Sequence, residues 1–246
     1  MRIFLAATST RESMGEKLLS IPYILESFYS INNKDTIDRI RNHNKENFLL
    51  DSGAFTFMNN LKGKIDFDKY LTDYIDFINK NDIKYFFELD VDVIVGYEKV
   101  KEMRRRLENE TNKKCIPVWH RSRGLEEWNK LTKEYNYIAI GGFAIKSIKK
   151  TEYKYIPKLL EIAKKNNCKV HGLGFTCTKE LKKYHFYSVD STNWLSGGRF
   201  GQIHTFNGEF IESKSFENKR AKDYRQIDEH NLKQWIQFQK YADKCL

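Results

Sequence analysis

Phe186-Tyr-Ser-Val-Asp-Ser-Thr-Asn-Trp-Leu-Ser-Gly-Gly-Arg-Phe-Gly201 is the stretch of sequence that decides the fold. Phe186 to Val189 is typical of a short buried strand, which stops on an acid, Asp190. A loop rich in hydroxyl groups and glycines follows, and it ends at Arg199 and Gly201. In α/β barrels, catalytic groups lie at the carboxyl ends of the strands, in loops that can approach a ligand closely. The stretch therefore predicts one strand end of an active-site rim.

The same pattern occurs at other predicted strand ends. Phe48-Leu-Leu-Asp-Ser-Gly-Ala-Phe55 and Tyr85-Phe-Phe-Glu-Leu-Asp90 each place acids after an apolar run. Further polar or glycine-rich ends are Trp119-His120, Gly141-Gly142 and His171-Gly-Leu-Gly174. Asp, Ser and Gly are also common at strand ends simply because they form turns and caps. Six such ends in one chain favour a shared site on the carboxyl-terminal face of a barrel.

The apolar segments predict a parallel sheet. They are short continuous runs that alternate with helical patterns, as expected for strands buried on both faces. The predicted strands are Arg2–Ala7, Phe48–Leu50, Lys84–Leu89, Cys115–Trp119, Tyr137–Ile140, Lys169–Leu173 and Phe186–Val189. The 246 residues suit a (β/α)8 barrel, which typically needs about 250. We expect an α/β fold with one TIM-like (β/α)8 barrel domain over residues 1–246. A doubly wound open sheet is the alternative.

Three local patterns complete the predicted fold. Leu18 to Tyr29 carries apolar residues near helical spacing, with Pro22 breaking the helix into two pieces. Asn207-Gly208 is a strong hairpin signal, and we expect the eighth strand within or just after this hairpin region. Asp228 to Leu246 predicts an amphipathic C-terminal helix.

The composition bounds the partners and the compartment. The net charge is +10, from 43 Lys and Arg against 33 Asp and Glu, which suits a polyanionic partner such as a nucleic acid. A general bias of the composition toward Lys, Asn and Ile is the alternative. The four cysteines form no CxxC pair, which argues against a zinc knuckle or a disulfide framework and favours a reducing compartment. With no apolar run of about 18 residues, we expect a cytoplasmic protein without a membrane partner.

Two carboxylates on one rim suit a substitution at a sugar carbon. One carboxylate attacks the anomeric carbon while the other manages the proton of the leaving or entering group. Small residues nearby allow backbone amides to reach a planar base. Composition and spacing do not choose the substrate.

Four segments, in this order, resemble motifs of the tRNA-guanine transglycosylase superfamily, which includes the 7-deazaguanine DNA transglycosylases of phages and bacteria. Asp51-Ser-Gly-Ala-Phe55 is similar to the family's Asp-Ser-Gly-Gly-Phe, and Ile140-Gly-Gly-Phe-Ala144 to its Ile-Gly-Gly-Leu-Ala. Gly172 to Leu181 resembles its Gly-Val-Gly-Thr-Pro-Glu-Asp-Leu stretch, with extra residues. Val189 to Gly201 resembles the segment that begins with the nucleophilic Asp. The resemblance covers roughly residues 48 to 208.

The resemblance implies a role for each acid. Asp190 would be the covalent nucleophile and Asp51 the acid/base. Asp90 would hydrogen-bond the purine, with Glu88 as a rival for that role. The remaining substrate-binding candidates are Ser52, Gly53, His120, Gly141, Gly142, Gly172 and Gly174. Candidates for stacking on the base are Trp119, Phe143 and Trp194, although packing in the core is the commoner role of such aromatics.

The departures from the family bear on the substrate. The family's zinc cluster should follow the hairpin, but Cys245 is the only cysteine after Asp190. Losing that tRNA-docking element favours DNA over tRNA. The implied activity replaces guanine in DNA with a free 7-cyano- or 7-aminomethyl-type 7-deazaguanine, without a metal or another cofactor. The same exchange on tRNA, a nucleoside or DNA glycosidic-bond hydrolase, and a non-catalytic nucleic-acid-binding barrel are the alternatives.

Arginines are the candidate phosphate contacts. They are Arg104, Arg105, Arg121, Arg123 and Arg199. A basic run on a helix is also typical of an ordinary solvated face, and this applies most to the first two. Arg199 differs because it lies in the loop after the predicted nucleophile.

Overall fold

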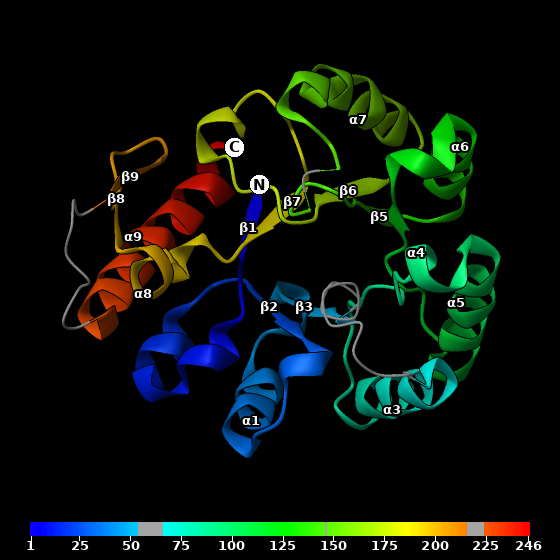
Figure 1. Ribbon diagram of the computed structural model, residues 1–246, viewed down its shortest axis with the longest axis horizontal. Coiled ribbons are helices and arrows are strands. Elements are labelled where there is room, and N and C mark those ends of the chain that lie inside the picture. The colour runs from blue at the N-terminus through cyan, green and yellow to red at the C-terminus, as the bar shows by residue number, and fades with distance from the viewer. Residues whose placement is uncertain (54–65, 146, 216–223) are drawn as a thin grey trace.

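A parallel sheet forms the centre of the molecule in a computed structural model, which describes residues 1–53, 66–145, 147–215 and 224–246. The sheet has seven strands in the order β3-β2-β1-β7-β6-β5-β4, and it is curled, with the helices arranged around its outer side (Figure 1). Its strands are β1 (Arg2–Ala6), β2 (Ile24–Ser27), β3 (Phe48–Asp51), β4 (Val118–Trp119), β5 (Tyr137–Ile140), β6 (Lys169–Gly172) and β7 (Ser188–Ser191).

Helices surround the outer side of this sheet (Figure 1). They include α1 (Lys34–Asn42), α3 (Phe67–Lys80), α4 (Asp92–Val95), α5 (Tyr97–Thr111), α6 (Gly124–Glu134), α7 (Ile156–Lys165), α8 (Ser196–Phe200) and α9 (Tyr224–Cys245). Longer ones such as α3 and α7 are amphipathic. In α3, Leu71, Ile75 and Ile78 are buried at helical spacing. The Asp66 carboxylate caps this helix by accepting the Lys69 N–H at 3.0 Å.

The two edges of the sheet are linked through residues 86 and 87. Leu50 of β3 forms an isolated parallel bridge with Phe86, and Phe87 forms another with Ile116, two residues before β4. The Phe87 N–H donates to the Leu50 carbonyl at 2.9 Å, and the Ile116 N–H donates to the Phe86 carbonyl at 2.8 Å. The predicted strand Lys84–Leu89 is thus represented by two bridging residues.

Two apolar cores lie on opposite faces of the strands. Successive side chains of a strand point to opposite faces, so Ile3 and Leu5 of β1 join the core under the helices. Phe4, Leu25, Leu49 and similar residues form a second cluster on the concave face of the sheet. Burial on both faces, predicted from the continuous apolar runs, is therefore confirmed.

The helix predicted over Leu18 to Tyr29 is wrong. Thr8–Ser20 forms 3-10 turns with non-helical backbone at Arg11 and Gly15, and Ile24–Ser27 is the strand β2. Proline disfavours a helical conformation in the residue before it, and Ile21 is accordingly extended (φ −75°, ψ 119°). β2 then pairs with both β1 and β3. The strand that the sequence left unplaced is therefore β2, not a segment after residue 203.

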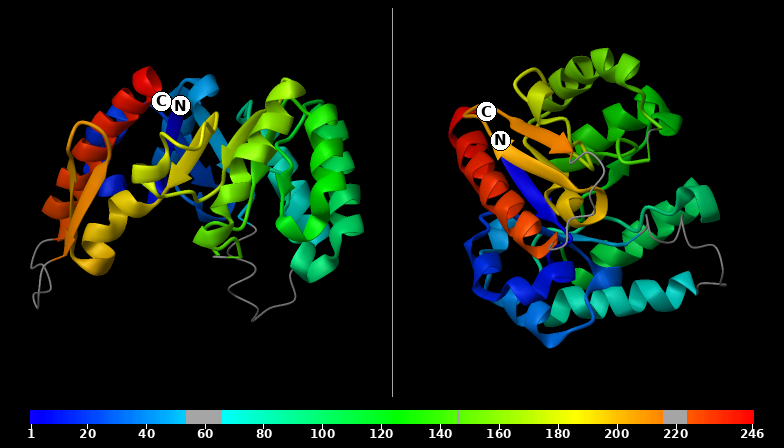
Figure 2. Two further views of the ribbon diagram at one scale, coloured as in Figure 1. Left: turned by 90° about the horizontal axis from the view of Figure 1, so that it is seen from above. Right: turned by 60° about the vertical axis from the view of Figure 1, so that its left-hand side comes forward.

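The C-terminal part packs against the first strand. The predicted hairpin is confirmed as β8 (Gln202–Phe206) and β9 (Ile211–Ser215), but it closes through four residues, 207–210, rather than a two-residue turn. The Gln239 side chain of α9 donates to the carbonyls of Ile3 at 2.7 Å and Tyr23 at 2.9 Å. The two termini lie side by side (Figures 1 and 2), and the Met1 ammonium donates to the Ala242 carbonyl at 2.9 Å.

None of the helices in the described ranges combines the length and the apolar composition needed to cross a bilayer. The described residues fold as one α/β unit. The sheet contains strands from residue 2 to residue 191, and α9 packs against its first strand, β1.

Candidate active site

The carboxyl ends of the strands bring three aspartates together. Asp51 ends β3, Asp190 lies in β7, and Asp90 follows the bridging residues 86 and 87. Burial and the negative charges of Asp190 and Asp90 together raise the pKa of Asp51 to about 6, against the opposing effect of a hydrogen bond from the Gly53 N–H. The convergence predicted from the strand-end pattern is thus reflected in the electrostatic coupling of the three groups.

Asp190 is held through one of its two carboxylate oxygens. Its Oδ1 accepts the Gly174 N–H at 2.6 Å and lies 3.1 Å from Nε2 of His171. Within the described ranges, no residue forms a hydrogen bond with Oδ2. The side chain is 10% exposed, whereas that of His171 is completely buried. One oxygen is therefore anchored, and the other is available to a reacting group.

Asp51 is the titratable group best suited to proton transfer. Its Oδ2 accepts the Gly53 N–H at 3.0 Å. A carboxyl group with a pKa near 6 can both release and accept a proton close to neutral pH. The neighbouring Ser52 hydroxyl is buried and has no hydrogen-bond partner in the described part of the chain, so it is free to bind a polar atom of a ligand.

Asp90 is fully engaged by two cationic or polar partners. Its Oδ1 accepts from the Arg123 guanidinium at 2.8 Å, and its Oδ2 lies 2.6 Å from Nε2 of His120. Burial lowers the pKa of His120, but the hydrogen bond and the charge of Asp90 outweigh burial, so that the pKa is raised overall. His120 and Asp90, both predicted as base-binding residues, form one hydrogen-bonded unit.

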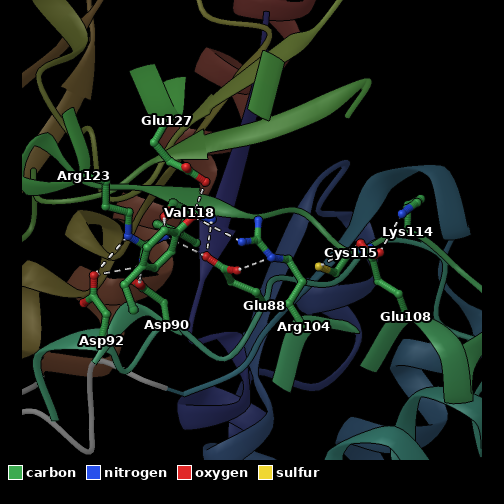
Figure 3. A network of polar contacts seen from close by, with 11 residues as sticks. Glu88, Asp90, Asp92, Arg104, Glu108, Lys114, Cys115, Val118, Arg123 and Glu127 are labelled. Carbon is green, nitrogen blue, oxygen red and sulfur yellow. Dashed lines mark hydrogen bonds and ion pairs between the residues drawn. The ribbon is translucent and has the colours of Figure 1, made fainter. Parts of the chain in front are cut away.

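A buried ionic network joins Asp90 to Glu88 through Arg123 (Figure 3). The Glu88 carboxylate accepts from the Val118 N–H at 2.9 Å and from Arg123 at 3.0 Å, and it lies 3.3 Å from Arg104. Burial raises the pKa of Glu88, while the two arginines oppose that shift. Glu88 thus points away from Asp190 and into the layer of helices, where it orients Arg123.

Arg123 also links Glu88 to two aspartates. Its guanidinium donates to Asp90 at 2.8 Å and to Asp92 at 3.0 Å, lies over the Tyr97 ring at 4.2 Å from the centroid, and is 2% exposed. Asp90, Asp92 and His120 offer ligand atoms within 4.8 Å of one another, a grouping that could hold a metal ion. The guanidinium of Arg123 already supplies the positive charge between the two aspartates, so the donor set does not fit a resident cation well.

The predicted phosphate-contacting arginines divide into two groups. Arg104 and Arg123 are buried against Glu88, so their charges are directed to that carboxylate and not to a surface. Arg105 and Arg199 are exposed and form no ion pair within the described residues. Arg121 is also exposed, although it contacts Glu152.

The glycines shape the floor of the site by allowing close approach. Gly174 has a left-handed backbone (φ +73°) that turns its N–H toward Asp190, and a Cβ there would lie 2.8 Å from the Ala144 Cβ. A Cβ on Gly141 would lie 2.5 Å from Cε1 of His120, so the ring packs directly on this backbone. The other predicted glycines follow strand ends as expected, with Gly142 after β5, Gly172 at the end of β6 and Gly53 after β3.

The predicted stacking aromatics are packed in the core. Trp194 is completely buried and donates to the Ala6 carbonyl at 2.9 Å, and Trp119 donates to the Gly124 carbonyl at 2.8 Å. Phe143 packs edge-on against Phe175, with ring centroids 5.1 Å apart. Ala54 and Phe55, the last two residues of the motif that begins at Asp51, lie outside the described residues.

Two buried polar groups of the strands were missed. His171 was quoted only as part of a glycine segment, yet it contacts Asp190. Glu26 of β2 is completely buried, accepts from the Ser9 N–H at 2.9 Å and contacts the Thr8 hydroxyl. Reading residues 18–29 as a helix concealed Glu26, whereas a strand following Pro22 would have placed it beside Leu50 of β3.

No model of a known protein family matches this chain, and no curated protein matches it significantly.

Proposed function

We propose that this protein is a base-exchange transglycosylase that replaces guanine in DNA with a free 7-deazaguanine through a covalent Asp190 intermediate. The observation that carries the proposal is the pair of carboxyl groups. Asp190 is anchored through Oδ1 with Oδ2 available, and Asp51 has a pKa of about 6 within electrostatic reach of it. The motif resemblance supplies the substrate class.

The two carboxyl groups suit successive displacements at C1′. Asp190 Oδ2 forms a bond to C1′ as the bond between C1′ and N9 of guanine breaks, and a proton from Asp51 neutralises the departing base. N9 of the incoming 7-deazaguanine then attacks C1′ and loses its proton to Asp51. The ester bond to Asp190 breaks, its electron pair returns to the carboxylate, and the two inversions retain the anomeric configuration.

The recognition groups would lie around this centre. The Ser52 hydroxyl, the backbone at Gly141 and the Asp90–His120 unit are candidates for the polar edge of the base. Because both oxygens of Asp90 already have partners, Asp90 would bind a base N–H with its remaining lone pairs or by releasing His120. A base in a duplex must be turned out to reach the site, at a cost of roughly a few kcal/mol. Arg105, Arg121 and Arg199 remain the surface candidates for phosphate contacts.

The full barrel architecture belongs to the same proposal. The bridges at Phe86 and Phe87 connect β3 to the segment before β4, and all the pairings of the sheet are parallel. We therefore propose that the sheet closes as a (β/α)8 barrel, with residues 86–87 as its shortest strand. In such a barrel the aspartates occupy the catalytic face.

The decisive experiment measures exchange directly. The protein is incubated with DNA, with tRNA, and with labelled 7-cyano- or 7-aminomethyl-7-deazaguanine, and the nucleosides are then digested and analysed by mass spectrometry. We expect the label in DNA. Label in tRNA alone would refute the DNA assignment, and base release without any free base added would instead indicate a hydrolase.

A further inference from the structure

A chain of hydrogen bonds runs through the interior of the sheet and ends on Asp190. The Tyr137 hydroxyl at the start of β5 lies 2.6 Å from the Ser188 hydroxyl at the start of β7. Ser188 Oγ lies 2.7 Å from Nδ1 of His171 in β6, whose Nε2 lies 3.1 Å from Asp190 Oδ1. Ser188 and His171 are completely buried and Tyr137 is 6% exposed, so water does not substitute for these partners.

Aromatic rings flank His171, and its two ring nitrogens face Ser188 and Asp190. The flanking rings are those of Phe4 and Phe87, with centroids 6.1 and 5.3 Å away. Burial of a charge among apolar groups is unfavourable unless it is fully paired. Asp190 would pair with one side of an imidazolium, but the other side would meet only the Ser188 hydroxyl.

The donors and acceptors available to Tyr137, Ser188 and His171 favour one direction for each hydrogen bond. Burial raises the pKa of Tyr137, so its phenol keeps its proton and serves as a donor. If Tyr137 donates to Ser188, the Ser188 hydroxyl can donate to Nδ1, which then must be the unprotonated nitrogen. The proton of the neutral ring is therefore on Nε2, where it faces Asp190. In an imidazolium Nδ1–H would donate to Ser188 Oγ, and the hydroxyl proton of either Ser188 or Tyr137 would then lack an acceptor among the described residues.

We infer that His171 is a positioning residue: the Tyr137–Ser188 pair holds it as the neutral Nε2–H tautomer, and it donates to Asp190 Oδ1 so that Oδ2 is the attacking atom. Its kinetic consequence rests on the proposed function. In the covalent intermediate Oδ1 is the carbonyl oxygen of the ester. When the bond between Oδ2 and C1′ breaks, negative charge returns to the carboxylate, where the His171 and Gly174 donors stabilise it.

The tautomer can be tested without any substrate. Nitrogen-15 spectra of ring-labelled histidine, with the His171 signals assigned by their loss in His171→Gln, should show a protonated Nε2 and an unprotonated Nδ1 at neutral pH. In Ser188→Ala the Nδ1 signal should move toward that of a nitrogen without a hydrogen-bond donor. An imidazolium or an Nδ1–H tautomer in the wild-type protein overturns the inference. These spectra remain decisive even if the protein exchanges no base.

Kinetics test the consequence for Asp190. His171→Leu should lower kcat by about 100-fold, the usual effect of losing one charge-stabilising donor. His171→Gln, which keeps an amide N–H in reach, should recover a large part of that loss. KM for the nucleic acid and for the free base should stay near the wild-type values, because His171 touches neither. A fall in kcat for His171→Gln equal to that for His171→Leu would contradict the donor role.

A matched pair of tyrosine variants distinguishes the effect of the hydrogen-bond chain from a general effect of losing a tyrosine hydroxyl. Tyr137→Phe removes the first donor, whereas Tyr85→Phe removes a hydroxyl at the same end of the sheet that instead donates to Glu46 at 2.9 Å. Tyr137→Phe should lower kcat several-fold with KM unchanged, and Tyr85→Phe should leave both unchanged. Equal kinetics for the two variants, at equal thermal stability, would overturn the role of the chain. Absence of exchange by the wild-type protein would refute the proposed function alone.

Discussion

Asp190 lies near the carboxyl end of β7 and Asp90 follows the bridging residues 86 and 87, but their surroundings are opposite. Asp190 is bound on Oδ1 by a backbone N–H and a buried histidine, and its Oδ2 is left available. Asp90 has both oxygens bound, one by Arg123 and one by His120. A carboxylate next to a guanidinium is stabilised as a fixed anion, whereas one held by neutral donors retains an oxygen for bond formation. The difference separates a reacting group from an orienting group.

Replacement of Asp190 is the most severe test of this difference. Asp190→Asn should reduce base exchange by about 10⁴-fold or more, because the covalent step loses its nucleophile. Denaturing gels should also lose the protein–nucleic acid adduct. The matched control is Asp82→Asn, which removes the same charge from an exposed carboxylate paired with lysines. Substantial exchange by Asp190→Asn would assign the nucleophile elsewhere.

Replacement of Arg123, which binds Asp90, should lower the free energy of unfolding. Arg123→Ala leaves Glu88 buried without one of its two arginines, and breaking a buried ion pair typically costs about 3–5 kcal/mol in the free energy of unfolding. Chemical denaturation monitors the loss. Because the pKa of Glu88 is already raised by burial, the loss should be smaller in acid, where Glu88 is protonated.

Arg121→Ala is the control for this experiment, since its side chain is 67% exposed and should hardly affect unfolding. If both arginine variants unfold at the same denaturant concentration, the buried network does not support the fold.

Asp51 should make the free energy of unfolding depend on pH. Its folded-state pKa of about 6 lies above the ordinary carboxyl value of 3.8, because burial disfavours the ionised form. The protein is therefore stabilised in acid, and this contribution is lost as pH rises through 6. Asp51→Asn cannot ionise. Relative to the wild type, its unfolding free energy should therefore rise by up to about 3 kcal/mol between pH 4 and pH 8. Urea titrations at several pH values measure it, and a pH-independent difference would contradict the raised pKa.

The smallest expected change concerns His120. Its pKa is raised by Asp90 against the effect of burial, so Asp90→Asn should lower it, and proton NMR titration of the ring can follow the change. Asp190→Asn is the comparison, because Asp190 contacts the other histidine. An unchanged His120 pKa in Asp90→Asn would contradict the hydrogen bond between His120 and Asp90.

The sequence predicted the positions of the aspartates better than it predicted their environments. A short apolar run that ends on an acid identifies a strand end, and Asp51, Asp90 and Asp190 follow or end such runs as expected. The partners of these acids depend on register between strands that are far apart in the chain. The pairing of His171 with Ser188 in the β6–β7 ladder, which sets the histidine beside Asp190, has no local signal.

The buried arginines show the same limit. Arg104 lies in a basic run on α5, a pattern that is typical of a solvated or nucleic-acid-binding face. Its partner Glu88 comes from a different element, and Arg123 joins them from the turn before α6. Tertiary proximity therefore decides whether an arginine faces solvent or an internal acid. β2 was missed for a different reason. Ile24–Ser27 is so short that its pattern of apolar and polar residues fits a helix and a strand equally well.

The place of β1 in the sheet has a consequence for synthesis on the ribosome. β1 can pair with β2 soon after both segments leave the ribosome. Its other side pairs with β7, so the contact between Arg2 and Ser188 forms only after most of the chain has been made. Its cover, α9, is translated later still. Until then an apolar strand edge is exposed to other nascent chains, a situation that promotes aggregation. We therefore expect slowed translation or chaperone depletion to reduce the yield of folded protein more than a change of temperature after folding is complete.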